Sequence, residues 1–251
     1  MKVIAIIPAA GLGTRMAAGG AKVSKQFTEI AGTPILIHTL RRFAASPRIT
    51  EMVVALRKPE LAQFAPRLKQ EPYAARVRLV EGGESRQQSV ANALAAIAGG
   101  RKQENDGPTP LPAQDLVGDI VLVHDGVRPF IDTAIIDSVI QAVEKHGAAI
   151  AGLPAVDTVK QVERTADGAI ITSTIPRERV VMAQTPQGFR LNLLRRAFAE
   201  AEADGFVGTD EASLVERAGR QVAVVMGSPR NIKITAPADL AIAELYAREM
   251  K

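Results

Sequence analysis

Short, continuously apolar runs alternate with amphipathic segments along most of this 251-residue chain, and this alternation limits its fold more than any other feature. Runs rich in Val, Ile and Leu predict strands at 3–8, 51–56, 77–80, 119–125 and 221–227. Strands that are apolar on both sides are typical of a parallel sheet buried between two layers of helices. We therefore expect an α/β fold: a Rossmann-like, mostly parallel sheet with helices on both faces.

Helix-like segments separate these runs. The apolar spacing predicts helices at 34–46, 59–70, 86–98, 133–146, 190–203, 210–218 and 236–249. Pro34 suits a first helical turn, and Ser85 and Asp132 can each cap the helix that follows. The length fits one large domain, so we expect a single domain over residues 1–251.

Two segments interrupt the alternation. Residues 99–118 are rich in Gly, Pro and polar residues and predict an exposed, tolerated insertion, with a functional loop as the alternative. Residues 156–175 alternate Val and Ile on both sides of an Ala-Asp-Gly turn, which predicts a β-hairpin. An isolated hairpin is marginal in water, so this arm, about residues 156–176, must pack on the domain or on a partner.

Composition excludes several classes of protein. The chain has no Cys, which rules out disulfides, thiolate zinc sites and cysteine nucleophiles. Aromatic residues make up 4%, too few to favour a base-stacking nucleic-acid surface. No apolar run approaches the ~18 residues that would span a membrane, and Pro8 interrupts the first one, which favours a buried strand over a secretion signal. We therefore expect a cytoplasmic protein without nucleic-acid or membrane partners.

The segment PAAGLGTRMAAGGAKVSKQF directly follows the first predicted strand. It lacks the P-loop pattern, and Met16 stands where a dinucleotide fingerprint needs its third glycine. Gly11 and Gly13 would instead let backbone amides surround an anion. Arg15 would add a forked contact and Lys25 a point charge. Solvated cations on a surface turn are the simpler alternative, but open α/β sheets bind ligands at this end of a strand.

This loop, with AAGLGTRM and SKQF, resembles the signature of nucleotidyltransferases that act on sugar and polyol phosphates. Further motifs follow in order: EGGESRQQSV (81–90), VLVHDGVRPF (121–130), DTVKQV (157–162), AQTPQGF (183–189), TDEASLVE (209–216) and NIKIT (231–235). Together they resemble the 2-C-methyl-D-erythritol 4-phosphate cytidylyltransferase family of the non-mevalonate isoprenoid pathway. The resemblance implies that CTP and the polyol phosphate react, with Mg²⁺, to give 4-diphosphocytidyl-2-C-methyl-D-erythritol and pyrophosphate.

The resemblance also implies roles for single residues. Catalysis would fall to Arg15, Lys25, Arg177 and Lys233. The CTP site would be formed by Ala9, Ala10, Gly11, Gly13, Gly83, Glu84 and Ser89. Substrate contacts would come from Asp125, Arg128, Thr158, Arg177, Thr185, Thr209 and Lys233, with Asp125 also holding the metal.

Two of these positions can be weighed on their own chemistry. Asp125 ends a predicted buried strand, and one carboxylate plus substrate phosphate oxygens is how proteins usually hold Mg²⁺. Capping a turn is the alternative for Asp125, and we expect His124 to be a buried structural residue. Lys233 lies between Ile232 and Ile234 in a predicted strand and would point to the opposite face, which is costly unless it meets an anion.

The residues around Arg177 do not by themselves indicate a function for it. Beside Glu178 it would be taken for a solvated charge. Only the resemblance implies that it reaches the site of a neighbouring subunit, and with it a homodimer. The sequence departs from the family pattern here: Pro176 replaces the acidic residue usual before this arginine, and the Leu-Trp that usually follows it is absent. Glu84 is a further departure, since Asp is common at that position.

Three other functions can be compared with the sequence. A pentitol-phosphate cytidylyltransferase, acting on ribitol 5-phosphate, would suit the hairpin equally well, although TDEASL favours methylerythritol phosphate. A nicotinamide oxidoreductase would need an acidic residue after the second strand, where Leu56, Arg57 and Lys58 stand. A non-catalytic binding module would not need Lys25 or Asp125.

Overall fold

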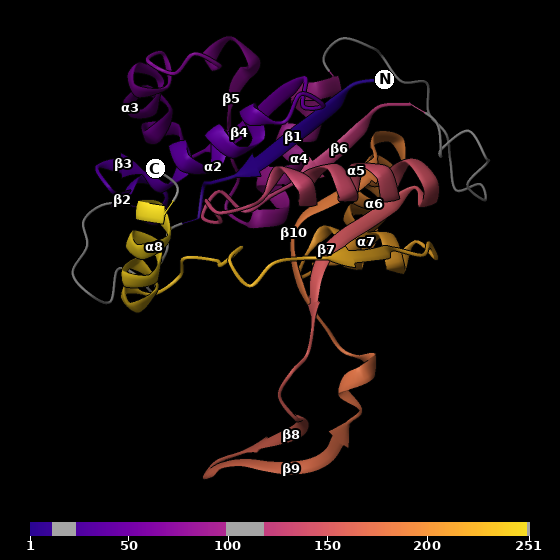
Figure 1. The fold of residues 1–251 in the computed structure, drawn as a ribbon. Coiled ribbons are helices and arrows are strands. Elements are labelled where there is room, and N and C mark those ends of the chain that lie inside the picture. The colour runs from indigo at the N-terminus through magenta and orange to yellow at the C-terminus, as the bar shows by residue number, and fades with distance from the viewer. Residues whose placement is uncertain (12–23, 99–117, 250–251) are drawn as a thin grey trace.

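The computed structural model describes residues 1–11, 24–98 and 118–249. Gly13, Arg15 and the predicted insertion up to residue 117 lie outside these ranges. A seven-stranded sheet forms the centre (Figure 1), in the order β11-β7-β10-β6-β1-β4-β5. Its strands are β1 Val3–Pro8, β4 Glu51–Leu56, β5 Val77–Glu81, β6 Ile120–Val123, β7 Ala148–Pro154, β10 Val181–Arg190 and β11 Ala223–Met226.

The order and direction of the strands indicate where the sheet can bind a ligand. Strand β10 is antiparallel to both of its neighbours, and the other neighbouring pairs are parallel, which confirms the predicted mostly parallel sheet. The chain runs outward from β1 through β4 and β5, then returns to β6 on the other side of β1. Connections therefore diverge beyond the carboxyl ends of β1 and β6, and open α/β sheets bind ligands at such a switch point.

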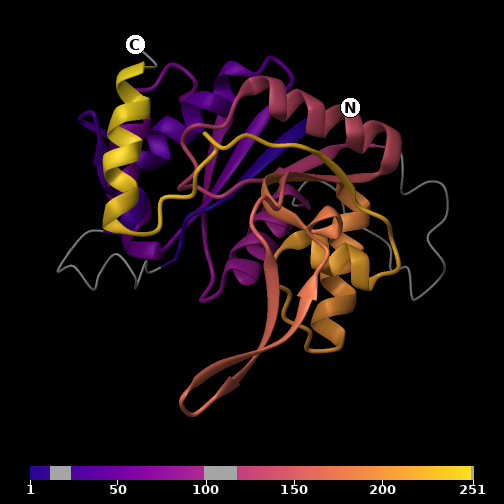
Figure 2. The ribbon, with the colours of Figure 1, turned by 60° about the horizontal axis from the view of Figure 1, so that its bottom comes forward.

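Helices cover both faces of the sheet, as predicted (Figure 2). One layer consists of α2 Ile35–Ala45, α3 Lys58–Leu68 and α5 Thr133–His146, and the other of α4 Arg86–Ala98, α6 Leu191–Ala203 and α7 Glu211–Arg217. Alternate residues of β1 enter different layers: Ala5 and Ile7 pack in the first core, and Ile4 and Ile6 in the second. Because both faces are covered, β1 is apolar at every position.

Local sequence signals fix several helix starts. Asp132 accepts a hydrogen bond from the Ala134 amide (3.0 Å) at the start of α5, and Ser85 Oγ accepts one from the Gln88 amide (3.0 Å) at the start of α4. Both predicted caps are confirmed. Pro34 precedes α2 instead of entering its first turn, because it pairs in a short ribbon of β2 Glu29–Ile30 and β3 Thr33–Pro34.

The region around Lys233 differs from the prediction. Residues 231–235 form no strand; the Ile234 amide instead donates to the Val127 carbonyl (3.0 Å) in the loop after β6. Helix α8, Pro237–Glu249, follows and packs Ala243 and Ala247 into a small third core. None of the helices in the described ranges is long and apolar enough to cross a membrane.

The predicted hairpin is confirmed and forms an arm that projects from the body (Figures 1 and 2). Strand β8, Val159–Thr165, pairs with β9, Gly168–Ile175, in a sheet of its own. A 3₁₀ turn at Arg177–Arg179 leads back to β10. Apolar side chains on the arm stay open to solvent: Ile170 is 63% exposed and Ile171 is 59% exposed.

Candidate active site

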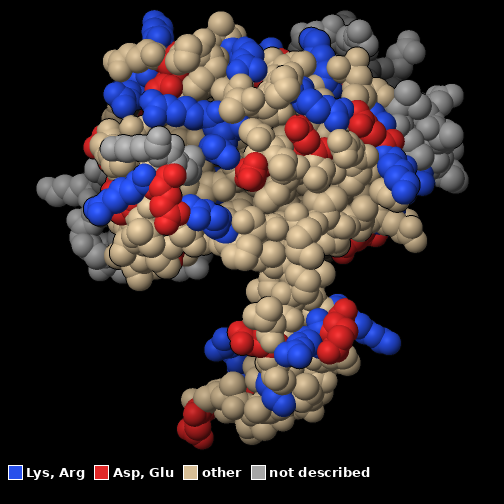
Figure 3. Space-filling model, viewed as in Figure 1, with Lys and Arg blue, Asp and Glu red and all other residues tan. Residues whose placement is uncertain are grey.

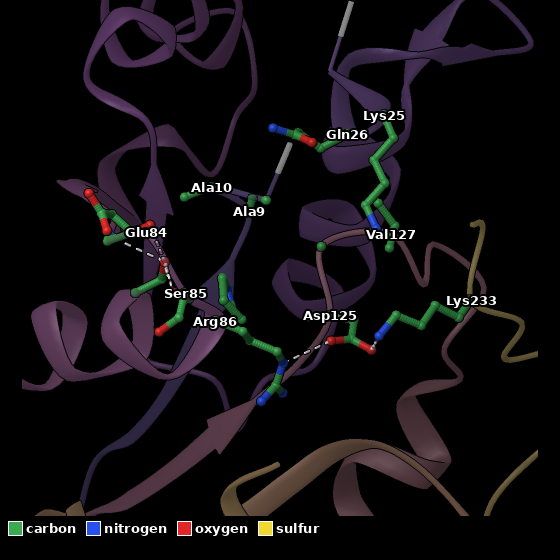
Figure 4. Close-up of a pocket in the computed structure, with 15 residues that line it drawn as sticks. Ala9, Ala10, Lys25, Gln26, Glu84, Ser85, Arg86, Asp125, Val127 and Lys233 are labelled. Atoms are coloured by element: carbon green, nitrogen blue, oxygen red, sulfur yellow. Dashed lines mark hydrogen bonds and ion pairs between the residues drawn. The ribbon is translucent and has the colours of Figure 1, made fainter. Parts of the chain in front are cut away.

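A pocket lies at the switch point and collects residues from distant parts of the chain (Figure 4). Nine of the predicted site residues line it: Ala9, Ala10, Gly11, Lys25, Gly83, Glu84, Ser89, Asp125 and Lys233. Gln26, Arg86 and Val127 also line it and were not among the predicted residues. The pocket therefore brings together the segments after β1, β5 and β6 with the Lys25 turn and the irregular segment before α8.

One wall of the pocket is built from small residues that approach closely. A Cβ atom on Gly82 would lie 2.5 Å from the Cβ of Ala10, so this contact requires glycine. Ser89 Oγ accepts from the Gly83 amide (3.1 Å) and donates to the Ser85 carbonyl (2.9 Å), which fixes the turn between β5 and α4. Such a wall leaves room for a flat ring, and exposed backbone groups can meet its edge.

The opposite wall centres on Asp125, just beyond β6. This residue is 6% exposed, and its Oδ1 accepts from Arg86 Nε (3.3 Å). Its Oδ2 accepts from Arg128 Nε (3.2 Å) and lies 3.0 Å from Lys233 Nζ. Burial opposes ionisation of Asp125 most strongly, but the three cations together outweigh burial and hold its pKa well below the usual range. Asp125 is therefore ionised.

Arg86 links Asp125 to a second carboxylate that sequence reasoning missed. Arg86 Nη1 donates to Glu211 Oε1 (2.6 Å), and Glu211 is 1% exposed at the start of α7. Burial raises the pKa of Glu211 despite the opposing charge of Arg86, and its Oε2 has no hydrogen-bond partner among the described residues. No spacing signal connects residues so far apart in the chain. In and around the pocket, four cationic side chains (Lys25, Arg86, Arg128 and Lys233) stand against three carboxylates (Glu84, Asp125 and Glu211).

A chain of hydrogen bonds holds Asp125 from behind. Its amide donates to Thr185 Oγ1 (3.1 Å), which lies 3.1 Å from His124 Nδ1. His124 Nε2 lies 3.0 Å from the Arg128 carbonyl, and since a carbonyl only accepts, Nε2 carries the proton and Nδ1 accepts from Thr185. Burial lowers the pKa of His124 to about 4, so the ring is neutral. The expectation that His124 is a buried structural residue is confirmed.

Comparison with known proteins identifies the family. The sequence profile described as 2-C-methyl-D-erythritol 4-phosphate cytidylyltransferase matches residues 3–249, nearly the entire chain. The chain belongs to this cytidylyltransferase family. The family resemblance of the seven motifs is thereby confirmed.

Individual members of the cytidylyltransferase family align with this chain over nearly their whole length. The protein of that name from Acidobacterium capsulatum is 60% identical over 251 residues, covering 99% of this chain and 98% of its own. The one from Solibacter usitatus is 51% identical over 253 residues, covering 99% and 97%. The crystal structure of the cytidylyltransferase from Thermus thermophilus has a TM-score of 0.72 at 34% identity and covers 99% of this chain and 100% of its own.

The other predicted site residues that lie in the described ranges are found beside the pocket or away from it. Arg128 and Thr185 contact Asp125 without lining the pocket. Thr158 and Thr209 are exposed. The Arg177 side chain is 56% exposed at the base of the arm, where its Nη1 donates to the Val156 carbonyl (2.8 Å). Three predicted contacts are therefore not assembled within one chain.

Proposed function

We propose that this pocket binds CTP and joins it to 2-C-methyl-D-erythritol 4-phosphate, yielding 4-diphosphocytidyl-2-C-methyl-D-erythritol and pyrophosphate. This reaction belongs to the non-mevalonate isoprenoid pathway. The observation that carries the proposal is one pocket with a small-residue wall on one side and a cation-rich wall on the other. The first suits the cytosine ring, and the second suits the phosphates of two anionic substrates.

The chemistry proposed is an in-line displacement. A phosphate oxygen of the polyol phosphate attacks the α-phosphorus of CTP, a new P–O bond forms, and the bond to the β-phosphate breaks to release pyrophosphate. The attacking phosphate is an anion near neutral pH, so no general base is needed. The protein must instead align two polyanions that repel each other and stabilise the charge of the transition state.

The pocket lining suggests how this work could be divided. Ala9, Ala10, Gly11, Gly83, Glu84 and Ser89 all line the pocket and would hold the cytidine part of CTP. Lys25 would act on the triphosphate, together with Arg15 and Gly13. Lys233 and Arg128 would act on the polyol phosphate, and both now bind Asp125. A phosphate that enters would share these cations with Asp125, because a lysine ammonium has three donors and an arginine guanidinium has five.

Asp125 fits one Mg²⁺ ligand, because it is ionised and lines the pocket. Its Oδ2 accepts from two cations, but its Oδ1 accepts from Arg86 alone, which leaves an acceptor position on Oδ1 for a metal. Among the described residues no group of three His, Cys, Asp or Glu side chains could hold a metal. The other ligands would have to be phosphate oxygens and water, and the bound metal would neutralise charge on the triphosphate.

We further infer a homodimer in which the arm reaches the neighbouring subunit. Arg177 and Thr158 lie on or beside the arm and do not line the pocket of their own chain. The arm also leaves Ile170 and Ile171 exposed, which a second copy would cover. Arg177 would then contact the polyol phosphate in the partner's pocket. We place the reaction in the cytoplasm, where cells hold CTP.

The direct test is CTP-dependent pyrophosphate release with 2-C-methyl-D-erythritol 4-phosphate, compared with ribitol 5-phosphate and ribulose 5-phosphate. We expect turnover with the first substrate and at least about 100-fold lower kcat/KM with the other two, because a site built for one set of hydroxyls rejects another. Equal rates with ribitol 5-phosphate would contradict the proposal. None of the relatives described above favours that alternative.

A further inference from the structure

A buried carboxylate outside the pocket holds the turn that carries Lys25. Glu60 lies in the first turn of α3, and its side chain is 6% exposed. Its Oε1 accepts from Ser24 Oγ (2.6 Å), and its Oε2 accepts from Gln26 Nε2 (3.3 Å). The two residues that flank Lys25 in the chain therefore bind the same carboxylate.

Ser24 and a pair of aromatic rings show that this attachment is specific. Ser24 occupies the N-cap position of the 3₁₀ turn Lys25–Phe27 but makes no capping hydrogen bond, because its hydroxyl is directed to Glu60. Phe27, at the end of the turn, packs on Phe64 with ring centroids 5.7 Å apart. Since Glu60 and Phe64 are four residues apart, they lie on the same face of α3 and hold the turn together.

The result is a fixed orientation for Lys25. Figure 4 shows its side chain extending toward Val127 and Asp125, whereas the side chain of Gln26 points away from it. A lysine side chain is long and flexible, so its backbone must be held firmly for the ammonium group to meet a developing charge in one place. The three contacts with α3 provide this restraint.

We propose that Glu60 is a positioning residue that fixes Lys25 by binding both of its neighbours, an inference that rests on the proposed role of Lys25 in the reaction. A carboxylate suits this task because it only accepts hydrogen bonds, and here three donors converge on it. Besides Ser24 and Gln26, Arg57 donates from its Nε (3.0 Å) and balances the charge. A Gln side chain at this position would place an NH₂ group, which is a donor, against at least one of these three donors.

The chain offers a matched control in Glu71. Its side chain is 7% exposed, and it pairs with Arg41 through two hydrogen bonds (3.0 and 2.7 Å), as Glu60 pairs with Arg57. Glu71 lies outside the pocket. We expect Glu60→Ala to lower kcat by about 10- to 100-fold, with KM for CTP within about threefold, because misplacing a catalytic group affects mainly the transition state. Glu71→Ala should lower thermal stability and leave kcat within about twofold.

Two less disruptive variants test the inference even if Glu60→Ala does not fold. Glu60→Gln retains an acceptor for Ser24 and should lower kcat less than the alanine variant. Ser24→Ala removes one contact without burying an unpaired charge and should lower kcat by about three- to tenfold. Wild-type kcat in both variants, with the fold confirmed by circular dichroism, would overturn the inference.

A double-mutant cycle shows whether Glu60 acts through Lys25. Once Lys25→Ala has removed the ammonium group, adding Ser24→Ala or Glu60→Gln should cost no further turnover, because contacts acting through one group are not additive. Additive losses would overturn the inference, as would equal falls in kcat for the Glu60 and Glu71 variants. If the wild-type protein does not turn over CTP, the proposed function itself is refuted. If Lys25→Ala is impaired but the Ser24 and Glu60 variants are fully active, the proposed function stands and only the role of Glu60 is refuted.

Discussion

The pocket and the arm hold their charged residues in opposite ways. In the pocket, Asp125 is 6% exposed and binds three cations, and Arg86 is fixed between two carboxylates. On the arm, Arg177 is 56% exposed and lies 3.8 Å from Glu178, which is itself 76% exposed. The environment of Asp125 and Arg86 is therefore supplied by their own chain, whereas the side chain of Arg177 is largely open to solvent.

The apolar residues of the two regions differ in the same way. The body of the protein buries Val, Ile and Leu between its sheet and two helical layers. The arm exposes them beside charged residues, and Figure 3 shows Lys, Arg, Asp and Glu side chains next to uncharged surface on this part of the molecule. A two-stranded ribbon has no second layer to cover it. The body therefore covers its own apolar residues, whereas the arm leaves several of its apolar residues exposed.

The largest effect is expected in the pocket. Lys25→Ala should lower turnover by about 10²- to 10³-fold, the usual loss when a preorganised transition-state contact is removed. Single-turnover pyrophosphate release with saturating CTP measures this loss directly. Near wild-type turnover would show that another cation of the glycine-rich loop performs the task, and Lys22→Ala is the variant to compare.

The next effect tests whether the arm completes a site in the other subunit. Lys25→Ala and Arg177→Ala should each be nearly inactive, but mixing them should restore about a quarter of wild-type activity. Random exchange makes half of the dimers hybrids, and each hybrid has one site of two with both residues intact. Native mass spectrometry of the mixture establishes that exchange has occurred.

The matched control pairs Lys25→Ala with a Lys25→Ala/Arg177→Ala double variant. No hybrid of these two contains an intact site, so mixing them should restore nothing. If exchange is complete and the first mixture also stays inactive, Arg177 acts within its own subunit. The distinction drawn between pocket and arm would then fail.

Much of the fold could be predicted because its physical causes are local. Continuous apolar strands, the caps at Ser85 and Asp132, and the alternation on both sides of the hairpin turn all left a pattern in the sequence. Strands β7 and β10 left no such pattern. β7 consists largely of small residues, and β10 carries buried polar residues, such as Gln187 (1% exposed), which bonds to Asp210 and to the amide of Ala212.

The site shows the same division between local and distant causes. Most of the pocket residues lie in the motifs recognised in the sequence. These motifs come together because loops that follow parallel strands meet at one edge of the sheet. Glu211 and Glu60 were missed, since each acts through a partner far away in the chain. The strand predicted around Lys233 was wrong because Ile234 bonds to the loop after β6 and not to a sheet edge.

A smaller effect, on the free energy of unfolding, is expected from His124 behind the pocket. His124 has its pKa lowered from 6.5 to about 4, so the unfolded chain binds the extra proton between these values. The free energy of unfolding should therefore fall as the pH drops through this window, by at most about 3 kcal/mol from this residue. His124→Gln should remove that part of the pH dependence. Urea unfolding at pH 4.5 and 7 measures the difference, and identical pH dependence in both proteins would contradict the buried, neutral state.

The smallest effect on the subunit itself is expected from the arm. Because Ile170 and Ile171 are 63% and 59% exposed, replacing both with Ser should change the free energy of unfolding of one subunit by only about 0.5 kcal/mol. The same change should raise the dimer dissociation constant by at least about tenfold, since two isoleucines would no longer be buried on the partner. Sedimentation across a dilution series measures this constant.

Leu245→Ser on α8 is the matched control, because Leu245 is 55% exposed but lies away from the arm. This substitution should leave the dimer unchanged. If the two variants have equal dimer affinity, the exposed isoleucines of the arm are not part of the contact surface.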